Sequence, residues 1–226
     1  MAVPKQAVLL HGAGGGAWEW NIWRSVFAAH GVDAAIPELQ PAAAGLSATT
    51  FDDYRTQVRV AIAALPRPRA LVGASLGGLL AMACADAVDA LVLVNPLPPA
   101  PWAAQLPARD WPDRVPWRRD TRLTGTRRAL PDADDATALF AFRRWRDESG
   151  AVLRAAQAGI AIERPRCPVL CIASQQDQDT PPALTVALAA HWGADLLRVS
   201  SSHVGPLLGR DAATMAAQVL AWLSDR

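Results

Sequence analysis

The feature that most constrains the fold is a glycine-rich turn around Ser75, residues 73–78 with the sequence GASLGG. A short apolar run, 70–72, precedes this turn, and an Ala/Leu-rich helical segment, 79–87, follows it. A serine between a strand and a helix sits in a tight, strained turn, and its hydroxyl stands out above the sheet. Gly73 and Gly77 leave room for the strand and the helix to pass each other. The pattern is typical of a nucleophile elbow, although a glycine-rich turn with an incidental serine would look the same.

Strand and helix patterns alternate along most of the chain, which predicts an α/β fold with a mostly parallel sheet and helices on both faces. Short continuous apolar runs suit buried parallel strands, and apolar residues at helical spacing fill the stretches between them. The expected strands are 7–10, 32–36, 70–72, 91–94, 169–173 and 196–199. One expected helix has an apolar ridge that includes Trp20, Trp23 and Phe27. Further helices are expected over about 51–65, 79–87 and 183–192, and from about 211 onward.

Residues 96–165 break this alternation and are crowded with proline, arginine and tryptophan. We expect them to form a cap inserted over the carboxyl ends of the strands, with its main helix over 131–148. The whole chain, 1–226, is then a single domain with this cap.

Composition limits the class of protein. The chain has 226 residues, of which 51% are hydrophobic and 19% charged, and its formal net charge is +1. We therefore expect a globular protein without affinity for nucleic acid or an anionic membrane surface. Its three cysteines show no metal spacing, the N-terminus resembles no signal peptide, and no apolar run reaches membrane-spanning length. These features predict buried thiols, no metal or other cofactor, and a cytoplasmic location.

Two polar segments follow the last two expected strands. A serine hydroxyl needs a base within hydrogen-bonding reach, and a third group must orient that base. His203 lies just past the last strand, and Asp177 and Asp179 follow the strand before it. The carboxyl ends of parallel strands lie at one edge of the sheet, so these side chains are expected near Ser75. Asp177 is the preferred acid because it is nearer the strand end, and Asp179 is the alternative.

The glycine loop after the first strand has two interpretations. Residues 12–17 (GAGGGA) satisfy a dinucleotide-binding pattern, with Asp33 or Glu38 about twenty residues further on. The alternative is an oxyanion loop, in which the backbone N–H of Ala13 is one donor and that of Leu76 the other. We favour the oxyanion loop. A dinucleotide site would not explain why Ser75, Asp177 and His203 all follow strand ends.

Together these segments resemble the α/β-hydrolase family over essentially the whole chain. His11-Gly12 is similar to its oxyanion-loop signature and residues 73–78 to its elbow, while Asp177 and His203 match its acid and base segments. The start of the chain resembles the small esterase and hydroxynitrile-lyase branches. Ala74 stands where the family often has histidine, Ser174 stands where glycine is frequent, and the usual N-terminal hairpin is largely missing.

The resemblance implies a Ser75–His203–Asp177 triad that cleaves a carboxylic ester or thioester of a small to medium, mostly apolar acyl substrate through an acyl-enzyme. Lyase chemistry with the same triad and a ligand receptor of low turnover remain alternatives. Cap aromatics could wall an acyl pocket or merely pack the cap on the sheet: Trp102, Trp111, Trp117, Phe140, Phe142 and Trp145. Cap arginines could dock an acyl carrier, but the acids among them favour a salt-bridged face: Arg118, Arg119, Arg127, Arg128, Arg143, Arg144 and Arg146.

Overall fold

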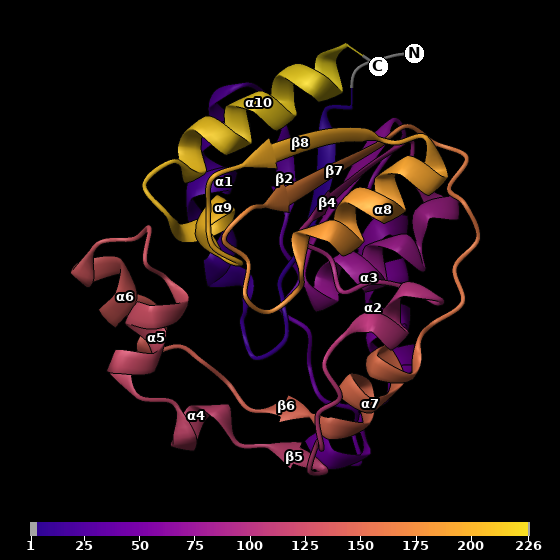
Figure 1. Ribbon diagram of the computed structural model, residues 1–226. Coiled ribbons are helices and arrows are strands. Elements are labelled where there is room, and N and C mark those ends of the chain that lie inside the picture. Colours follow the sequence, from indigo (N-terminus) through magenta and orange to yellow (C-terminus); the bar gives the residue numbers. More distant parts are fainter. Residues whose placement is uncertain (1–3, 226) are drawn as a thin grey trace.

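A computed structural model describes residues 4–225, which contain a six-stranded sheet with every neighbouring pair of strands parallel (Figure 1). The predicted α/β class with a parallel sheet is confirmed. The strand order is β2-β1-β3-β4-β7-β8. These strands are β1 (Gln6–Leu10), β2 (Asp33–Ala35), β3 (Arg69–Ala74), β4 (Ala90–Val94), β7 (Val169–Ser174) and β8 (Asp195–Val199).

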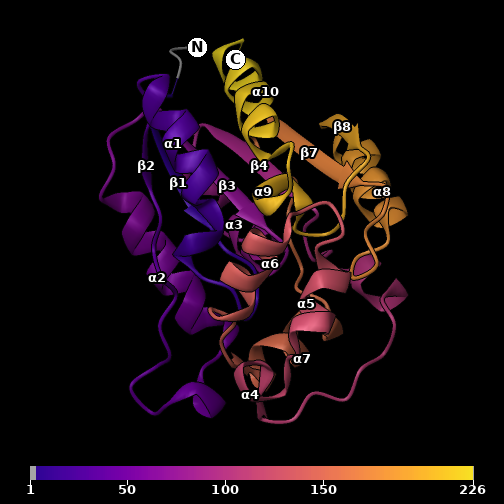
Figure 2. The same cartoon turned by 90° about the vertical axis from the view of Figure 1, so that its left-hand side faces the viewer.

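Helices cover both faces of the sheet, as Figures 1 and 2 show. One face packs against α1 (Asn21–Ala29) and α10 (Ala212–Ser224), through a core that includes Trp23, Phe27 and Val219. The other face packs against α2, α3 and α8, through a second core. These helices are α2 (Phe51–Ala63), α3 (Leu76–Met82) and α8 (Pro182–Trp192), and shorter turns are η1 (Ala17–Trp20), η2 (Leu46–Ala48), η3 (Ala85–Ala87) and α9 (Gly205–Leu208).

The sheet order creates a crevice at its carboxyl edge. The chain moves outward from β1 to β2, then returns to pair β3 with the other side of β1. At such a switch point the loops that follow the two neighbouring strands diverge, and ligands bind between them. Here those loops are the glycine loop after β1 and the turn at Ser75 after β3. The topology therefore places both predicted oxyanion donors beside the predicted nucleophile.

Between β4 and β7 the chain leaves the sheet and runs past its carboxyl edge (Figure 1). We call residues 96–165 the inserted segment. Its elements are η4 (Trp102–Gln105), β5 (Arg114–Val115), α4 (Trp117–Asp120), α5 (Leu123–Ala129), α6 (Asp135–Phe142), β6 (Glu148–Ser149) and α7 (Gly150–Ala158). None of the helices in residues 4–225 is long and apolar enough to cross a membrane.

Two predicted helix boundaries were wrong. The helix expected over 131–148 is the shorter α6, because Asp134 caps its start and the backbone N–H of Arg146 bonds to the carbonyl of Gly14, 2.7 Å away, instead of continuing a helix. Glu148 lies in β6 and pairs with Val115. The helix expected over 79–87 begins at Leu76 and ends at Met82, because the carbonyl of Ser75 already accepts the first helical hydrogen bonds.

Close packing between α3 and β1 gives a first prediction. A Cβ atom at Gly77 would lie 2.4 Å from the carbonyl oxygen of Leu10 and 2.5 Å from that of His11, both of them backbone atoms. Gly77→Ala should therefore lower the free energy of unfolding by about 3 kcal/mol or more, measured by urea denaturation. Gly125→Ala is the matched control, because no atom lies within 4 Å of its added Cβ. Equal stability of the two variants would contradict the packing described here.

Candidate active site

Ser75 occupies a strained turn between β3 and α3. Its backbone angles are φ 53° and ψ −119°, a left-handed conformation that residues other than glycine rarely adopt. Surrounding hydrogen bonds hold it there: its N–H donates to the carbonyl of Val94 at 3.1 Å, and its carbonyl accepts from Leu97 at 2.9 Å. The half-buried side chain lines a cavity at the carboxyl edge of the sheet. This is the geometry expected of an elbow nucleophile.

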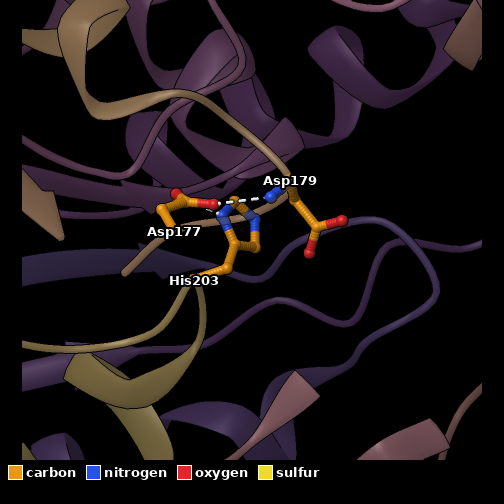
Figure 3. Close-up of side chains that lie close together, drawn as sticks. All are labelled: Asp177, Asp179 and His203. Atoms are coloured by element: carbon orange, nitrogen blue, oxygen red, sulfur yellow. Dashed lines mark hydrogen bonds and ion pairs between the residues drawn. The ribbon is translucent and has the colours of Figure 1, made fainter. Parts of the chain in front are cut away.

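Asp177 and His203 are joined by a hydrogen bond across the ends of β7 and β8 (Figure 3). Nδ1–H of His203 donates to Oδ2 of Asp177 over 2.7 Å. The other carboxylate oxygen of Asp177 accepts the backbone N–H groups of Asp179 and Thr180, each at 2.8 Å. Three donors thus fix a buried carboxylate, and this carboxylate fixes the tautomer of the imidazole and leaves Nε2 as the acceptor.

Burial opposes a charged imidazole at His203, but the hydrogen bond and the charge of Asp177 outweigh burial, so the pKa of His203 is raised. His203 and Ser75 line the same cavity. Within residues 4–225 and in this conformation, no hydrogen bond joins the Ser75 hydroxyl to the imidazole. Catalytic hydrogen bonds often form only when substrate is bound.

Asp179 differs from Asp177 in both burial and contacts. Its side chain is 55% exposed and lies 3.8 Å from the guanidinium of Arg109. Asp179, Asp177 and His203 have oxygen and nitrogen atoms within 4.8 Å of one another, a spacing that could hold a metal ion. However, the hydrogen bond between Asp177 and His203 already occupies one atom of each. The contacts favour Asp177 as the residue that orients the histidine.

Carboxylates hold the glycine loop after β1 at three points. The N–H of Gly12 donates to Glu19 at 3.1 Å, that of Gly14 to Glu148 at 3.0 Å, and that of Ala17 to Glu38 at 2.9 Å. Among residues 4–225, no group accepts from the N–H of Ala13 or from that of Leu76. Gly12 lies against Ser75, since a Cβ added there would be 3.3 Å from Cβ of Ser75. Ala13, whose N–H has no acceptor among these residues, lines the same cavity as Ser75.

The same contacts argue against the dinucleotide interpretation. A pyrophosphate would need the N–H groups of the loop, and two of those within residues 12–16 already bind carboxylates. Glu38, a candidate for binding a ribose, instead pairs with Arg146 at 2.6 Å. The negative side chains around the loop would repel a pyrophosphate.

His11 is a structural residue. Nδ1–H donates to the carbonyl of Gly12 at 2.8 Å, and Nε2 accepts the N–H of Leu39 at 3.2 Å. Burial, together with the charge of nearby Arg146, lowers the pKa of His11 to about 4. The neutral imidazole of His11 thus fixes the position of Gly12, the first residue of the glycine loop.

Two residues that the sequence analysis did not assign support the loop of His203. Asn95, at the end of β4, donates to Oγ of Ser174 at 2.8 Å and to the carbonyl of His203 at 2.7 Å. Asp132, from the inserted segment, accepts the hydroxyls of Ser201 and Ser202 at 2.6 and 2.7 Å. Ser174, which stands where glycine was expected, is therefore a partner of Asn95. Nothing in the local sequence signals either contact, because each joins residues more than sixty positions apart.

The cavity has a volume of about 610 Å³ and mostly apolar walls. Of the six cap aromatics, Trp111, Trp117 and Trp145 line it. Two of the other three pack edge-on against rings elsewhere: Trp102 on His191, and Phe140 on Trp18. Some of these aromatics therefore line the cavity, as one interpretation predicted, and others serve in packing, as the alternative predicted.

Several arginines of the inserted segment are paired. Arg119 binds Asp120 at 2.7 Å, and Arg127 binds Asp135 at 2.9 Å. The arginines that line the cavity are Arg109, Arg122 and Arg128, of which the sequence analysis named only the last. Docking of an acyl carrier stays a prediction.

Comparison with known proteins identifies the family. The model of the alpha/beta hydrolase family matches residues 7–218, so the chain belongs to this family. No curated protein matched the chain. Similar solved structures include polyneuridine aldehyde esterase (17% identity, TM-score 0.73, covering 96% of this chain and 99% of that chain). A pyrethroid hydrolase from Sphingobium faniae JZ-2 is 18% identical with a TM-score of 0.75, and the match covers 97% of each chain.

Methylketone synthase I of tomato, in complex with 2-tridecanone, is also similar, at 17% identity and a TM-score of 0.76 over 99% of each chain. Identities this low show a shared fold and nothing about substrate.

Burial of Glu19 gives a prediction about stability. Burial raises the pKa of Glu19 from 4.5 to about 7. Between these pH values the unfolded chain releases this proton and the folded chain keeps it, so the carboxyl lowers stability progressively as pH rises from 4.5 to 7. Glu19→Gln should remove this loss and gain up to about 3 kcal/mol over wild type by pH 8. Urea denaturation at pH 4.5 and pH 8 measures the difference, with the exposed Glu163→Gln as control. Equal pH dependence in wild type and Glu19→Gln would contradict it.

Proposed function

We propose that the protein is a serine hydrolase that cleaves a carboxylic ester or thioester of a small to medium, mostly apolar acyl substrate through an acyl-enzyme on Ser75. The observation that carries the proposal is the 2.7 Å hydrogen bond between Asp177 and His203, in a cavity that Ser75 also lines. An oriented histidine with a free Nε2, next to a serine in a strained elbow, is the arrangement that activates a hydroxyl for acyl transfer.

The proposed mechanism has two half-reactions. Oγ of Ser75 attacks the acyl carbonyl while Nε2 of His203 takes its proton, and the imidazolium returns that proton to the leaving alcohol or thiol. Water then attacks the acyl-enzyme while Nε2 of His203 takes its proton, and the imidazolium returns that proton to Oγ of Ser75 as the carboxylic acid leaves. Asp177 stabilises the imidazolium in both steps. The free N–H groups of Ala13 and Leu76 stabilise the oxyanion, and loss of one such donor costs about 10²–10³ in rate.

The walls of the cavity support an apolar acyl group. Trp111, Trp117, Leu97 and Leu153 contribute apolar surface around the predicted nucleophile. Two similar structures bear the names of an esterase and a pyrethroid hydrolase, which agree with a hydrolase reaction. Lyase chemistry and ligand reception with little turnover are the competing outcomes of the tests below.

The choice of acid is testable by a matched pair of variants. Asp177→Asn should lower kcat by about 10³–10⁴, because an amide leaves the histidine without its orienting carboxylate. Asp179→Asn should lower kcat less than about threefold, because the exposed Asp179 side chain makes no hydrogen bond to His203. Steady-state hydrolysis of 1-naphthyl butyrate measures both. The reverse ranking would make Asp179 the acid.

A substrate panel tests the reaction class. Acyl esters and acyl thioesters of increasing chain length, assayed on wild type and Ser75→Ala, should give turnover that depends on the serine and favours apolar chains. A fluorophosphonate probe should label wild type and leave Ser75→Ala unlabelled. Labelling without turnover, together with a ligand-induced rise in Tm, would instead indicate a receptor. Cleavage of a cyanohydrin in preference to every ester would indicate a lyase.

A further inference from the structure

The site contains a carboxyl group that the proposed mechanism does not use. Glu19, in η1, is only 2% exposed, yet it lines the same cavity as Ser75 and His203. Its Oε2 atom accepts the N–H of Gly12 at 3.1 Å. Its Oε1 atom has no hydrogen-bond partner in residues 4–225, and it lies against Gly15, where an added Cβ would come within 1.9 Å of it. Burial of a carboxyl that accepts a single hydrogen bond costs stability, so the place of Glu19 in the wall of this cavity calls for a role.

We propose that Glu19 is a second ionisable group of the active site, which supports the oxyanion loop through Gly12 and must be protonated for full activity. This inference rests on the proposed hydrolase function, because it concerns the oxyanion of acyl transfer. Glu19 acts here through the backbone of the loop and through its charge, so it is a positioning residue.

The geometry gives the reason for the protonated form. Glu19 binds the N–H of Gly12, and the next N–H along the chain, that of Ala13, has no acceptor among residues 4–225. Ala13 and Ser75 line the same cavity. An oxyanion held by Ala13 would therefore form close to the carboxyl of Glu19. A neutral carboxyl keeps the hydrogen bond to Gly12 and adds no charge, whereas a carboxylate repels the oxyanion in surroundings of low dielectric constant.

The charged groups around Glu19 set the pH at which it ionises. Burial and, to a smaller extent, the charge of Glu38 raise its pKa, the N–H of Gly12 and the charges of His203 and Arg146 lower it, and the net value is about 7. These groups come from the loop after β8, the inserted segment and the loop after β2. His11 adds no charge near neutral pH, since its pKa is lowered to about 4. Glu19 therefore changes charge within the range in which a serine hydrolase operates.

The charge on Glu19 bears on both limbs of the pH–rate profile. Ionised Glu19 is one of the charges that raise the pKa of His203. Below its own ionisation Glu19 is neutral, so Glu19→Gln should leave the acid limb of the pH–rate profile, which reports neutral His203, nearly in place. The same substitution should remove the fall in rate at high pH that deprotonation of Glu19 causes. A variant that lacks the charge but keeps the hydrogen bond is thus expected to be active over a wider range of pH.

The experiment compares wild type, Glu19→Gln, Glu19→Ala and the exposed control Glu163→Gln. Hydrolysis of 1-naphthyl butyrate is followed from pH 5 to 9, and 1-naphthol is quantified by chromatography so that the readout is independent of pH. Wild type and Glu163→Gln should lose about tenfold in kcat/KM per pH unit above the ionisation of Glu19. Glu19→Gln should stay within about twofold of its maximum up to pH 9. Glu19→Ala, without the bond to Gly12, should have a lower kcat at every pH.

A second readout does not depend on activity. Proteins with ¹³C-labelled glutamate carboxyls are titrated by NMR, and the resonance absent from Glu19→Gln should titrate near neutral pH in wild type. The proposal is overturned if the high-pH limb is the same in wild type and Glu19→Gln, or if that resonance titrates below pH 5. Failure of the wild type to hydrolyse any ester overturns the hydrolase function, and the NMR titration still decides the ionisation of Glu19 independently.

Discussion

Hydrogen bonds from backbone N–H groups to buried carboxylates hold this site together. Asp177 accepts two of them and orients His203 with its remaining oxygen, while Glu19 and Glu148 accept those of the glycine loop. Burial strengthens a hydrogen bond to a carboxyl oxygen, and the bond is stronger still where the carboxyl is ionised. Loops at the edge of a sheet lack ladder hydrogen bonds, so without these carboxylates the loops around Ser75 would be free to move.

Much of the architecture follows from local sequence signals. Continuous apolar runs mark the strands because both faces of β3 and β4 are buried, and the glycines at 73 and 77 mark the turn because a Cβ there would meet backbone. The parallel direction of the strands then places Ser75, Asp177 and His203 at the same edge. The positions of the predicted site residues could therefore be read from strand ends, without knowledge of side-chain contacts.

Other parts of the site could not be predicted in this way. Asp132, Glu148 and Asn95 reach their partners over long sequence separations, and the residues around them carry no motif. The inserted segment was hardest, because its short elements follow contacts with the glycine loop and not their own periodicity: α6 ends at Phe142, and Arg146 then bonds to Gly14 and Gly15. Glu19 is a further case, since a glutamate between two tryptophans looks like an exposed residue of a helix.

The contacts of the inserted segment have a consequence for how this enzyme fold could be altered. An inserted segment of this kind could be regarded as an exchangeable part that selects the substrate. Here, however, Glu148 and Arg146 bond to the glycine loop on one side of the crevice, and Asp132 bonds to the loop of His203 on the other. A segment taken from another protein would lack these three side chains, and the glycine loop and the loop of His203 would both lose these hydrogen bonds. Exchange of sequence is therefore expected to be tolerated best in stretches of the inserted segment outside those three residues, such as the exposed turns around α4 and α5.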